Sequence, residues 1–241
     1  YTYATTVALL LEAAAEADAA VVVCDRPNLL GPAVAGPTLD PELRSFLGYL
    51  DVPFQHGLTI GELLRWHAAG AASGRADPIV VPVDGWRRDE AAPLLPFVPP
   101  SPGLPSRDAV ALYPGLVLLE GANLSEGRGT PLPFALVAAP WLDPYELADD
   151  LAQLDLPGLW ARPLSVEPEA GPFAGRPCGG VQVHVVDPAA LRPFEAGLRI
   201  LAHLRARRPE LRWVDATEMP WSGDADAGRP WHEPARGPLL D

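Results

Sequence analysis

The sequence lacks the features that would place it in several broad classes of protein. No apolar run in its 241 residues approaches the length that a helix needs to cross a bilayer. Basic residues are scarce: 18 Lys and Arg stand against 31 Asp and Glu, for a formal net charge of -13. Because binding to phosphate groups requires a basic face, we expect no nucleic acid among its partners, and no membrane span.

Cysteine is nearly absent as well, which excludes a disulfide framework and a CxxC metal signature. Cys24 ends an apolar run and is predicted to be a buried thiol, whereas Cys178 is predicted to lie in a glycine-containing turn. Three histidines lack the spacing of metal ligands: His67, His203 and His232. We therefore expect no metal site.

Strands and helices alternate along the chain, which predicts an α/β fold in two lobes. In the first half, helices are predicted at residues 7–18 and 60–70, and strands at 19–28 and 79–83. Thr59 and Glu62 have the spacing of a capping box at the start of the second helix. A continuous apolar strand directly after a helix is typical of a parallel sheet that is buried on both faces.

A proline cluster at residues 96–106 predicts a boundary, with domains at 1–98 and 99–241. Beyond it we expect a strand over Leu116–Glu120, a helix from about Pro144 to Leu154 and a strand at 181–186. A long helix is predicted from Pro188 to Arg207, followed by a loose tail from about residue 220. The apolar side of this helix is expected to carry Leu191, Leu198, Leu201 and Leu204.

Polar residues follow the first predicted strand, at 25-DRPN-28. Ligands of open α/β sheets bind outside the carboxyl ends of the strands, so Asp25 and Arg26 are candidate site residues. The alternative is that they only satisfy the loop backbone and each other. His56 is a second candidate, as a hydrogen-bond donor or a general acid/base, unless it merely packs ahead of the cap at Thr59.

The third candidate is the stretch 120-EGANLSEGRGT-130, where polar side chains stand between glycines. Glu120 and Glu126 would supply acid/base or hydroxyl-binding carboxylates, and Arg128 would bind an anion. The glycines permit positive φ or a close approach of the backbone. The alternative is a glycine-rich turn with a buried Glu–Arg pair. Phosphate-loop, GxGxxG and GxSxG patterns are missing.

Taken together, these stretches resemble the exo-β-N-acetylmuramidase family, the NamZ-type glycoside hydrolases that were formerly a domain of unknown function. The matching landmarks are 1-YTY-3, 25-DRPN-28, the segment from Gly36 to Asp40, 44-RSF-46, 56-HGLTIGEL-63, 84-DGWRR-88, 98-VPPSP-102, 113-YPG-115, 120-EGANLSEGRGT-130, 139-APW-141 and 178-CGGVQVHV-185. They cover nearly the whole chain, and the block from Glu120 to Thr130 is the most specific.

The resemblance implies a Rossmann-like parallel-sheet lobe, incomplete at its N-terminus here, and a smaller α/β C-terminal lobe, with the active site in a cleft between them. The implied reaction releases N-acetylmuramic acid from the non-reducing ends of peptidoglycan strands. Within this chain Glu126 is the catalytic candidate, although the resemblance places the family's catalytic glutamate elsewhere, and Arg128 suits the lactyl carboxylate of muramic acid. The implied substrate-binding residues are Tyr1, Tyr3, Asp25, Arg26, Asn28, His56, Glu120, Asn123, Ser125 and Arg128.

The sequence also departs from the family pattern. The Ser-Pro-Glu-His-type stretch that carries the family's catalytic glutamate and the family's C-terminal helices have no match here. We therefore expect a chain that is truncated at both ends and has little muramidase activity by itself. The alternatives are a catalytically inactive muropeptide- or carbohydrate-binding α/β protein and, less favoured, a nucleotide-binding module. The resemblance favours a secreted or cell-envelope location and implies no cofactor, because glycoside hydrolysis needs only water and side chains.

Overall fold

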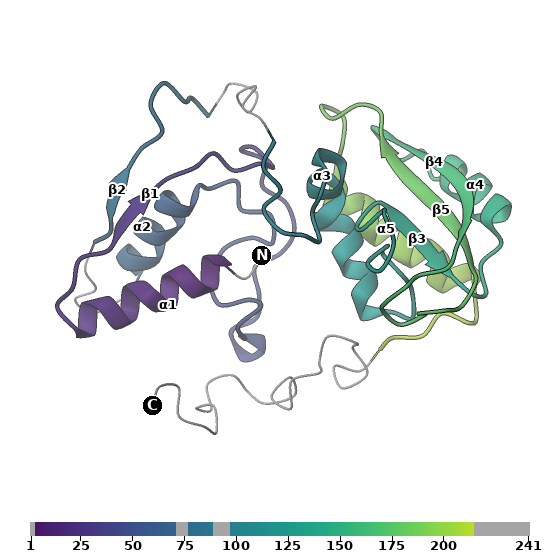
Figure 1. The fold of residues 1–241 in the computed structure, drawn as a ribbon, viewed down its shortest axis with the longest axis horizontal. Helices are drawn as coiled ribbons and strands as arrows, with labels where there is room; N and C mark the ends of the chain where they lie inside the picture. The colour runs from purple at the N-terminus through teal and green to yellow at the C-terminus, as the bar shows by residue number, and fades with distance from the viewer. Residues whose placement is uncertain (1–2, 71–76, 89–96, 215–241) are drawn as a thin grey trace. The chain divides into compact units, whose positions relative to one another are not determined.

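The computed structural model describes residues 3–70, 77–88 and 97–214, which form two compact units (Figure 1). Unit 1 contains the described residues up to 88, and unit 2 contains residues 97–214. Unit 1 has a parallel sheet and unit 2 an antiparallel sheet, each with helices, so the predicted α/β class is confirmed. Among the described residues, none of the helices has the length and apolar character that crossing a membrane requires.

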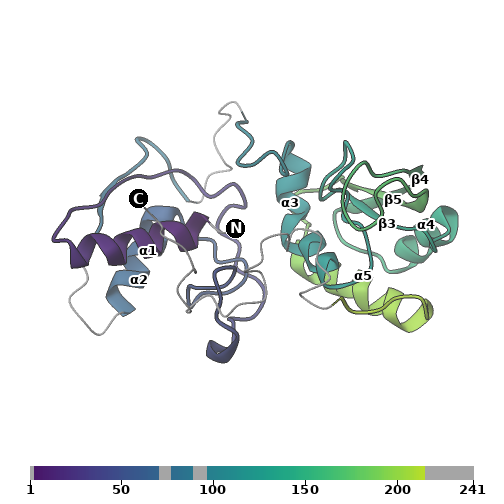
Figure 2. The same cartoon turned by 60° about the horizontal axis from the view of Figure 1, so that its bottom comes forward.

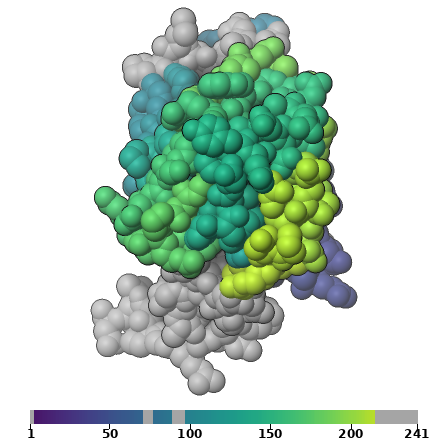
Figure 3. Space-filling view, turned by 90° about the vertical axis from the view of Figure 1, so that its right-hand side faces the viewer, coloured from purple at the N-terminus to yellow at the C-terminus, as the bar shows by residue number. Residues whose placement is uncertain are grey.

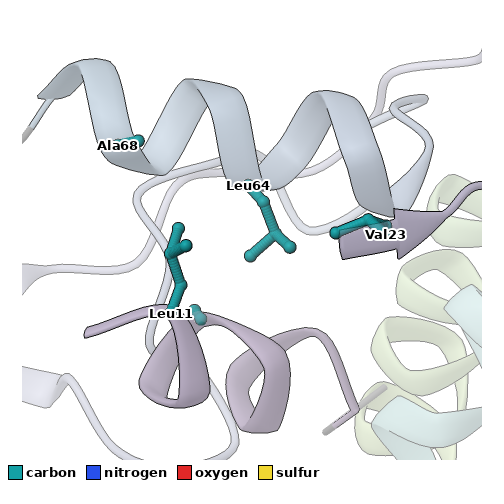
Figure 4. Close-up of a cluster of buried hydrophobic side chains, with 5 residues drawn as sticks. Leu11, Val23, Leu64 and Ala68 are labelled. Atoms are coloured by element: carbon teal, nitrogen blue, oxygen red, sulfur yellow. The ribbon is translucent and has the colours of Figure 1, made fainter. Parts of the chain in front are cut away.

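Unit 1 packs two helices against a short parallel sheet. Its elements are α1 (Tyr3–Glu16), β1 (Val22–Cys24), the 3-10 helix η1 (Pro41–Leu43), α2 (Ile60–Gly70) and β2 (Ile79–Val81). β1 and β2 pair in parallel, with Val23 opposite Val80. Ala8 and Leu11 of α1, Val23 of β1, and Leu64 and Ala68 of α2 form the core, and the labelled side chains in Figure 4 point toward one another. Their spacing puts each pair of helical residues on one helix face.

The opposite face of this sheet is exposed. Val22 is 58% exposed, Ile79 55% and Val81 48%. Cys24 lies on the same face by strand alternation and is also exposed, so the prediction of a buried thiol was wrong. The apolar run around Cys24 suggested burial on both faces, but among the described residues only the face of Val23 is covered.

Unit 2 is built on a three-stranded antiparallel sheet with the order β3-β5-β4. Its elements are α3 (Arg107–Leu116), the 3-10 helix η2 (Val117–Gly121), β3 (Leu136–Ala139), α4 (Pro144–Gln153), β4 (Leu159–Val166), β5 (Cys178–Val185) and α5 (Pro193–Arg207). One cavity of about 260 Å³ is lined by residues of both helices and of the sheet, among them Leu151 of α4, Ala161, Val183 and Ile200 of α5. Both helices therefore border the same face of the sheet. Figure 3 views unit 2 from the side on which α4 lies in Figure 1.

The predicted strand over Leu116–Glu120 was wrong. This segment is the end of α3 followed by η2. The Ser106 hydroxyl accepts a hydrogen bond from the N–H of Ala109 at 3.1 Å and so caps α3. Leu112, Leu116 and Leu119 are buried at helical spacing. A short apolar run fits a strand and a buried helix equally well, and here the cap decides for the helix.

Four other elements of unit 2 differ from expectation. β3 was not predicted because it is buried at all four positions and shows no alternation, and β4 was not predicted either. Cys178 is buried and begins β5 instead of lying in a turn. α5 begins at Pro193, later than predicted, and its Leu198 is 47% exposed while Ala196 and Ile200 are buried. The predicted tail lies outside the described residues.

α3 and α5 lie side by side (Figure 1 and Figure 2) and cross at two glycines. A Cβ on Gly115 would lie 2.0 Å from the carbonyl oxygen of Pro193, and one on Gly197 would lie 2.2 Å from the carbonyl oxygen of Gly115. Both contacts involve backbone, which cannot move aside as a side chain can. The absence of a side chain at both positions therefore sets the distance between the two helices.

We expect Gly115→Ala to destabilise the protein by about 1–3 kcal/mol, because the added methyl group must force α3 and α5 apart. The melting temperature should fall by several degrees. Gly121→Ala is the matched control, since a Cβ there meets nothing within 4 Å. Equal melting temperatures for the two variants would show that the helices separate without cost.

Candidate functional site

Asp25 follows β1 and holds the start of α2. Its backbone N–H donates to the Val81 carbonyl at 3.0 Å, which extends the β1–β2 pairing. The carboxylate is buried and accepts hydrogen bonds from the Thr59 hydroxyl at 2.6 Å and from the N–H groups of Gly61 and Arg26 at 3.0 Å each. Asp25 thus satisfies donors at the N-terminus of α2 as well as the loop backbone.

The predicted capping box at the start of α2 is present. The Thr59 N–H donates to Glu62 Oε2 at 2.9 Å, and the Glu62 N–H donates to the Thr59 hydroxyl at 3.2 Å. Burial raises the pKa of Glu62, but hydrogen bonds from Arg88 and Thr59 outweigh it and lower that pKa below its ordinary value. Arg88 also donates to the Gly57 carbonyl. Sequence reasoning used Arg88 only as a landmark, although its position after a strand parallel to β1 was a usable signal.

Asn28 and His56 both bind the backbone of residue 58. The Asn28 amide donates to the Leu58 carbonyl at 3.0 Å and accepts from the Leu30 N–H at 2.9 Å, while His56 Nδ1 accepts from the Leu58 N–H at 3.1 Å. Burial lowers the pKa of His56 below 6.5, so the ring is neutral at neutral pH. Because Nδ1 is an acceptor, the proton lies on Nε2, which makes Nε2 a donor.

Arg26 is exposed, and its guanidinium donates to the carbonyl oxygens of Cys24 at 3.3 Å and Asp25 at 2.6 Å. Unit 1 therefore brings Asp25, Asn28 and His56 to residues 58–61 at the start of α2, whereas Arg26 bonds to the carbonyl oxygens of Cys24 and Asp25. Tyr3 begins α1 and is 60% exposed, and Tyr1 lies outside the described residues. The substrate-binding roles of these residues remain predictions.

In unit 2, a tight turn follows η2 and pairs with β3. The N–H of Ser125 donates to the Ala138 carbonyl at 2.8 Å, and the N–H of Ala138 returns a bond to the Ser125 carbonyl at 3.0 Å. The buried Ser125 hydroxyl accepts from the Gly127 N–H at 3.3 Å. Gly127 has φ +100°, and a Cβ there would lie 2.1 Å from the Leu132 carbonyl oxygen. This glycine is therefore required by the protein's own backbone.

Glu126 and Arg128 form an ion pair at this turn. Arg128 Nε donates to Glu126 Oε1 at 2.6 Å, and Arg128 Nη2 pairs with Glu120 Oε1. Glu126 is 2% exposed, and Phe134 lies under the guanidinium with its ring centroid 5.3 Å from Arg128 Cζ. Burial raises the pKa of Glu126, against the backbone hydrogen bonds that lower it. One guanidinium serves two carboxylates, so the positive charge of Arg128 is shared between Glu126 and Glu120.

Asn123 connects this turn to the segment after α5. Its amide donates to the Glu210 carbonyl at 3.0 Å and accepts from the Arg212 N–H at 2.8 Å. Both polar atoms of the side chain thus have backbone partners. Unit 2 brings Glu120, Glu126 and Arg128 together, whereas Asn123 faces the segment at 210–212. Among the described residues, no cluster of His, Cys, Asp and Glu has the composition of a metal site.

His56 predicts a specific pH dependence of stability. Because its pKa is lower in the folded chain than in the unfolded chain, its stabilising contribution is present above pH 6.5 and is lost as the pH falls through the folded pKa. We expect the melting temperature of the wild-type protein to fall more steeply with acidification below pH 6.5 than that of His56→Gln. Parallel curves for the two proteins would contradict this, since the other histidines are common to both.

Comparison with known proteins identifies the family. The model for exo-beta-N-acetylmuramidase NamZ, N-terminal, matches residues 1–108, and the model for the C-terminal part matches residues 111–229. The peptidoglycan beta-N-acetylmuramidase NamZ of Bacillus subtilis is 40% identical over 213 residues, which are 87% of this chain and 51% of the relative. The chain therefore spans about half the length of this curated relative.

Two crystal structures of DUF1343 family proteins from Bacteroides fragilis are similar to most of this chain. The first has a TM-score of 0.79 and is 32% identical in sequence, and the match covers 87% of this chain and 56% of that chain. The second has a TM-score of 0.63 and is 29% identical, and the match covers 80% of this chain and 53% of that chain. These matches confirm the resemblance that the sequence landmarks indicated. The chain belongs to the NamZ family of exo-β-N-acetylmuramidases.

Proposed function

We propose that this protein is a peptidoglycan-sugar hydrolase, an exo-acting β-N-acetylmuramidase that releases N-acetylmuramic acid from the non-reducing ends of glycan strands. Family membership supports this proposal, because the Bacillus subtilis relative is a peptidoglycan beta-N-acetylmuramidase. The ligand that the protein is then expected to bind is a carbohydrate that carries carboxylate groups.

The observation that carries the proposal is the buried carboxyl group of Glu126. Glycosidic bonds are cleaved with a pair of carboxyl groups, one of which must hold a proton for the leaving oxygen. Burial raises the pKa of Glu126, which is the direction of shift that a general acid requires. Glu120 is held by the same arginine and supplies a second carboxyl group at this turn.

A second candidate function is binding of muropeptides without hydrolysis. The hydrogen-bond partners of two carboxylates favour this binding function. Glu126 is bound to Arg128, and the Asp25 carboxylate accepts three hydrogen bonds from its own chain. In that case residues 1–241 bind N-acetylmuramic acid but release little of it from a glycoside.

Replacing Glu126 with Gln separates the two candidates. We expect Glu126→Gln to lower kcat/KM for release of N-acetylmuramic acid from a chromogenic muramide by roughly a hundredfold to ten-thousandfold, the range for loss of a general acid. Glu146→Gln on α4, where the side chain of Glu146 is 70% exposed, is the matched control. An unchanged rate in Glu126→Gln would exclude Glu126 as the acid, and wild-type binding without hydrolysis would favour the second candidate.

Arg128 offers a further test, because its contacts indicate that it holds the two glutamates in place. Lysine keeps the charge but cannot donate along both directions of the guanidinium. We expect Arg128→Lys to lower the melting temperature and to weaken binding of N-acetylmuramic acid and N-acetylglucosamine glycosides by the same factor, measured by calorimetry. A loss confined to the muramic sugar would instead show that Arg128 recognises the lactyl carboxylate.

A further inference from the structure

Four side chains form a block on β4 and β5 that the candidate site does not include. They are Trp160 and Arg162 on β4 and their cross-strand partners His184 and Gln182 on β5. Residues directly opposite in an antiparallel pair, and residues two apart on one strand, share a face of the sheet. The four side chains therefore stand together on one face, and we name this set the sheet platform.

The contacts within the sheet platform are specific. The rings of Trp160 and His184 lie with centroids 5.3 Å apart at an interplanar angle of 35°. Arg162 Nη2 donates to Gln182 Oε1 at 2.7 Å. The indole is thus backed by an imidazole, and the guanidinium is oriented by an amide. Such support holds an aromatic ring and a cation in fixed positions.

This face is open in the part of the chain that the structure describes. Trp160 is 55% exposed and Arg162 is exposed. The alternating residues Ala161 and Val183 line the cavity beside α4, which Trp160 also borders. His184 Nε2 is buried and has no hydrogen-bond partner among the described residues. Because this nitrogen is itself shielded from solvent, the surface that the platform offers consists of the exposed indole of Trp160 and the guanidinium of Arg162.

We propose that the sheet platform binds a peptidoglycan glycan strand as a substrate-holding surface outside the candidate site. The ligand class rests on the proposed function. An exposed indole stacks on the apolar faces of sugar rings, and the Gln182 amide, whose oxygen accepts from Arg162, provides N–H donors for hydroxyl and acetamido groups. Arg162 matches the carboxylates that lactyl groups and peptide stems place along the strand.

Charge argues for this ligand over another that stacks on aromatic rings. Nucleic-acid bases also stack on tryptophan, but their phosphates require a positive field, and the chain has a net charge of -13. A glycan strand has carboxylates only at intervals, so a single arginine on an otherwise neutral platform suits it. The platform lies along strands, and two successive pairs span about 7 Å along β4.

The test is co-sedimentation of the protein with purified insoluble peptidoglycan and, separately, with chitin, which lacks lactyl and peptide carboxylates. We expect Trp160→Ala to bind both polymers roughly three- to tenfold more weakly than the wild type. Arg162→Gln should bind peptidoglycan roughly two- to fivefold more weakly and chitin equally well. Trp66→Ala, at a tryptophan of 59% exposure in unit 1, is the matched control and should bind as the wild type does.

Wild-type-like binding of Trp160→Ala to peptidoglycan would overturn the proposal, and so would a wild type that binds no peptidoglycan. If Arg162→Gln lost affinity for chitin by the same factor as for peptidoglycan, Arg162 would have no role in binding carboxylates. Trp160→Phe retains an aromatic ring and should lie between the wild type and alanine, which guards against a folding defect in the alanine variant. Sedimentation does not require hydrolysis, so this comparison decides the platform whatever the outcome of the Glu126→Gln experiment.

Discussion

Burial of the Glu126 carboxyl group is the constraint on which the polar turn of unit 2 depends. A carboxylate that is 2% exposed must find donors within the protein, and Arg128 supplies one while the turn backbone supplies others. Arg128 in turn draws Glu120 into the same cluster. The turn can close tightly enough only because Gly127 adopts positive φ against the Leu132 carbonyl. The glycine-rich composition of the turn, the positive φ of Gly127 and the raised pKa of Glu126 are thus all linked to one buried carboxyl group.

Asp25 shows the other way to bury a carboxylate. It receives a hydroxyl and two backbone N–H groups and no guanidinium, because it stands at the N-terminus of α2, where unpaired donors and the helix dipole favour negative charge. Asp25 therefore couples a strand end to a helix start. Glu126 instead shares Arg128 with Glu120, and burial raises its pKa. The same chemical group is structural in one unit and a candidate acid in the other.

Local signals in the sequence predicted what local interactions determine. The capping box of Thr59 and Glu62 and the strand at Val23 follow from spacing alone, and the cluster of Glu126 and Arg128 follows from a glycine-rich turn. Local spacing failed for Leu116–Glu120, because a run of four apolar residues fits both a strand and a buried helix. It also had no means of finding the partners of Asn123, which lie 87 and 89 positions along the chain. Contacts of that range depend on the fold as a whole.

The anchoring of Asn123 has a consequence for the thermodynamics of ligand binding. The segment that carries Glu120 and Glu126 is held on one side by residues 210–214, where Val214 donates to the Gly121 carbonyl at 3.0 Å, and on the other by the pairing of Ser125 with Ala138. Such a segment is preorganised: a ligand that binds it meets donors and acceptors whose positions are already ordered. A ligand that bound this segment would cost little conformational entropy, so its affinity would depend on desolvation and hydrogen-bond geometry more than on the ordering of a loop.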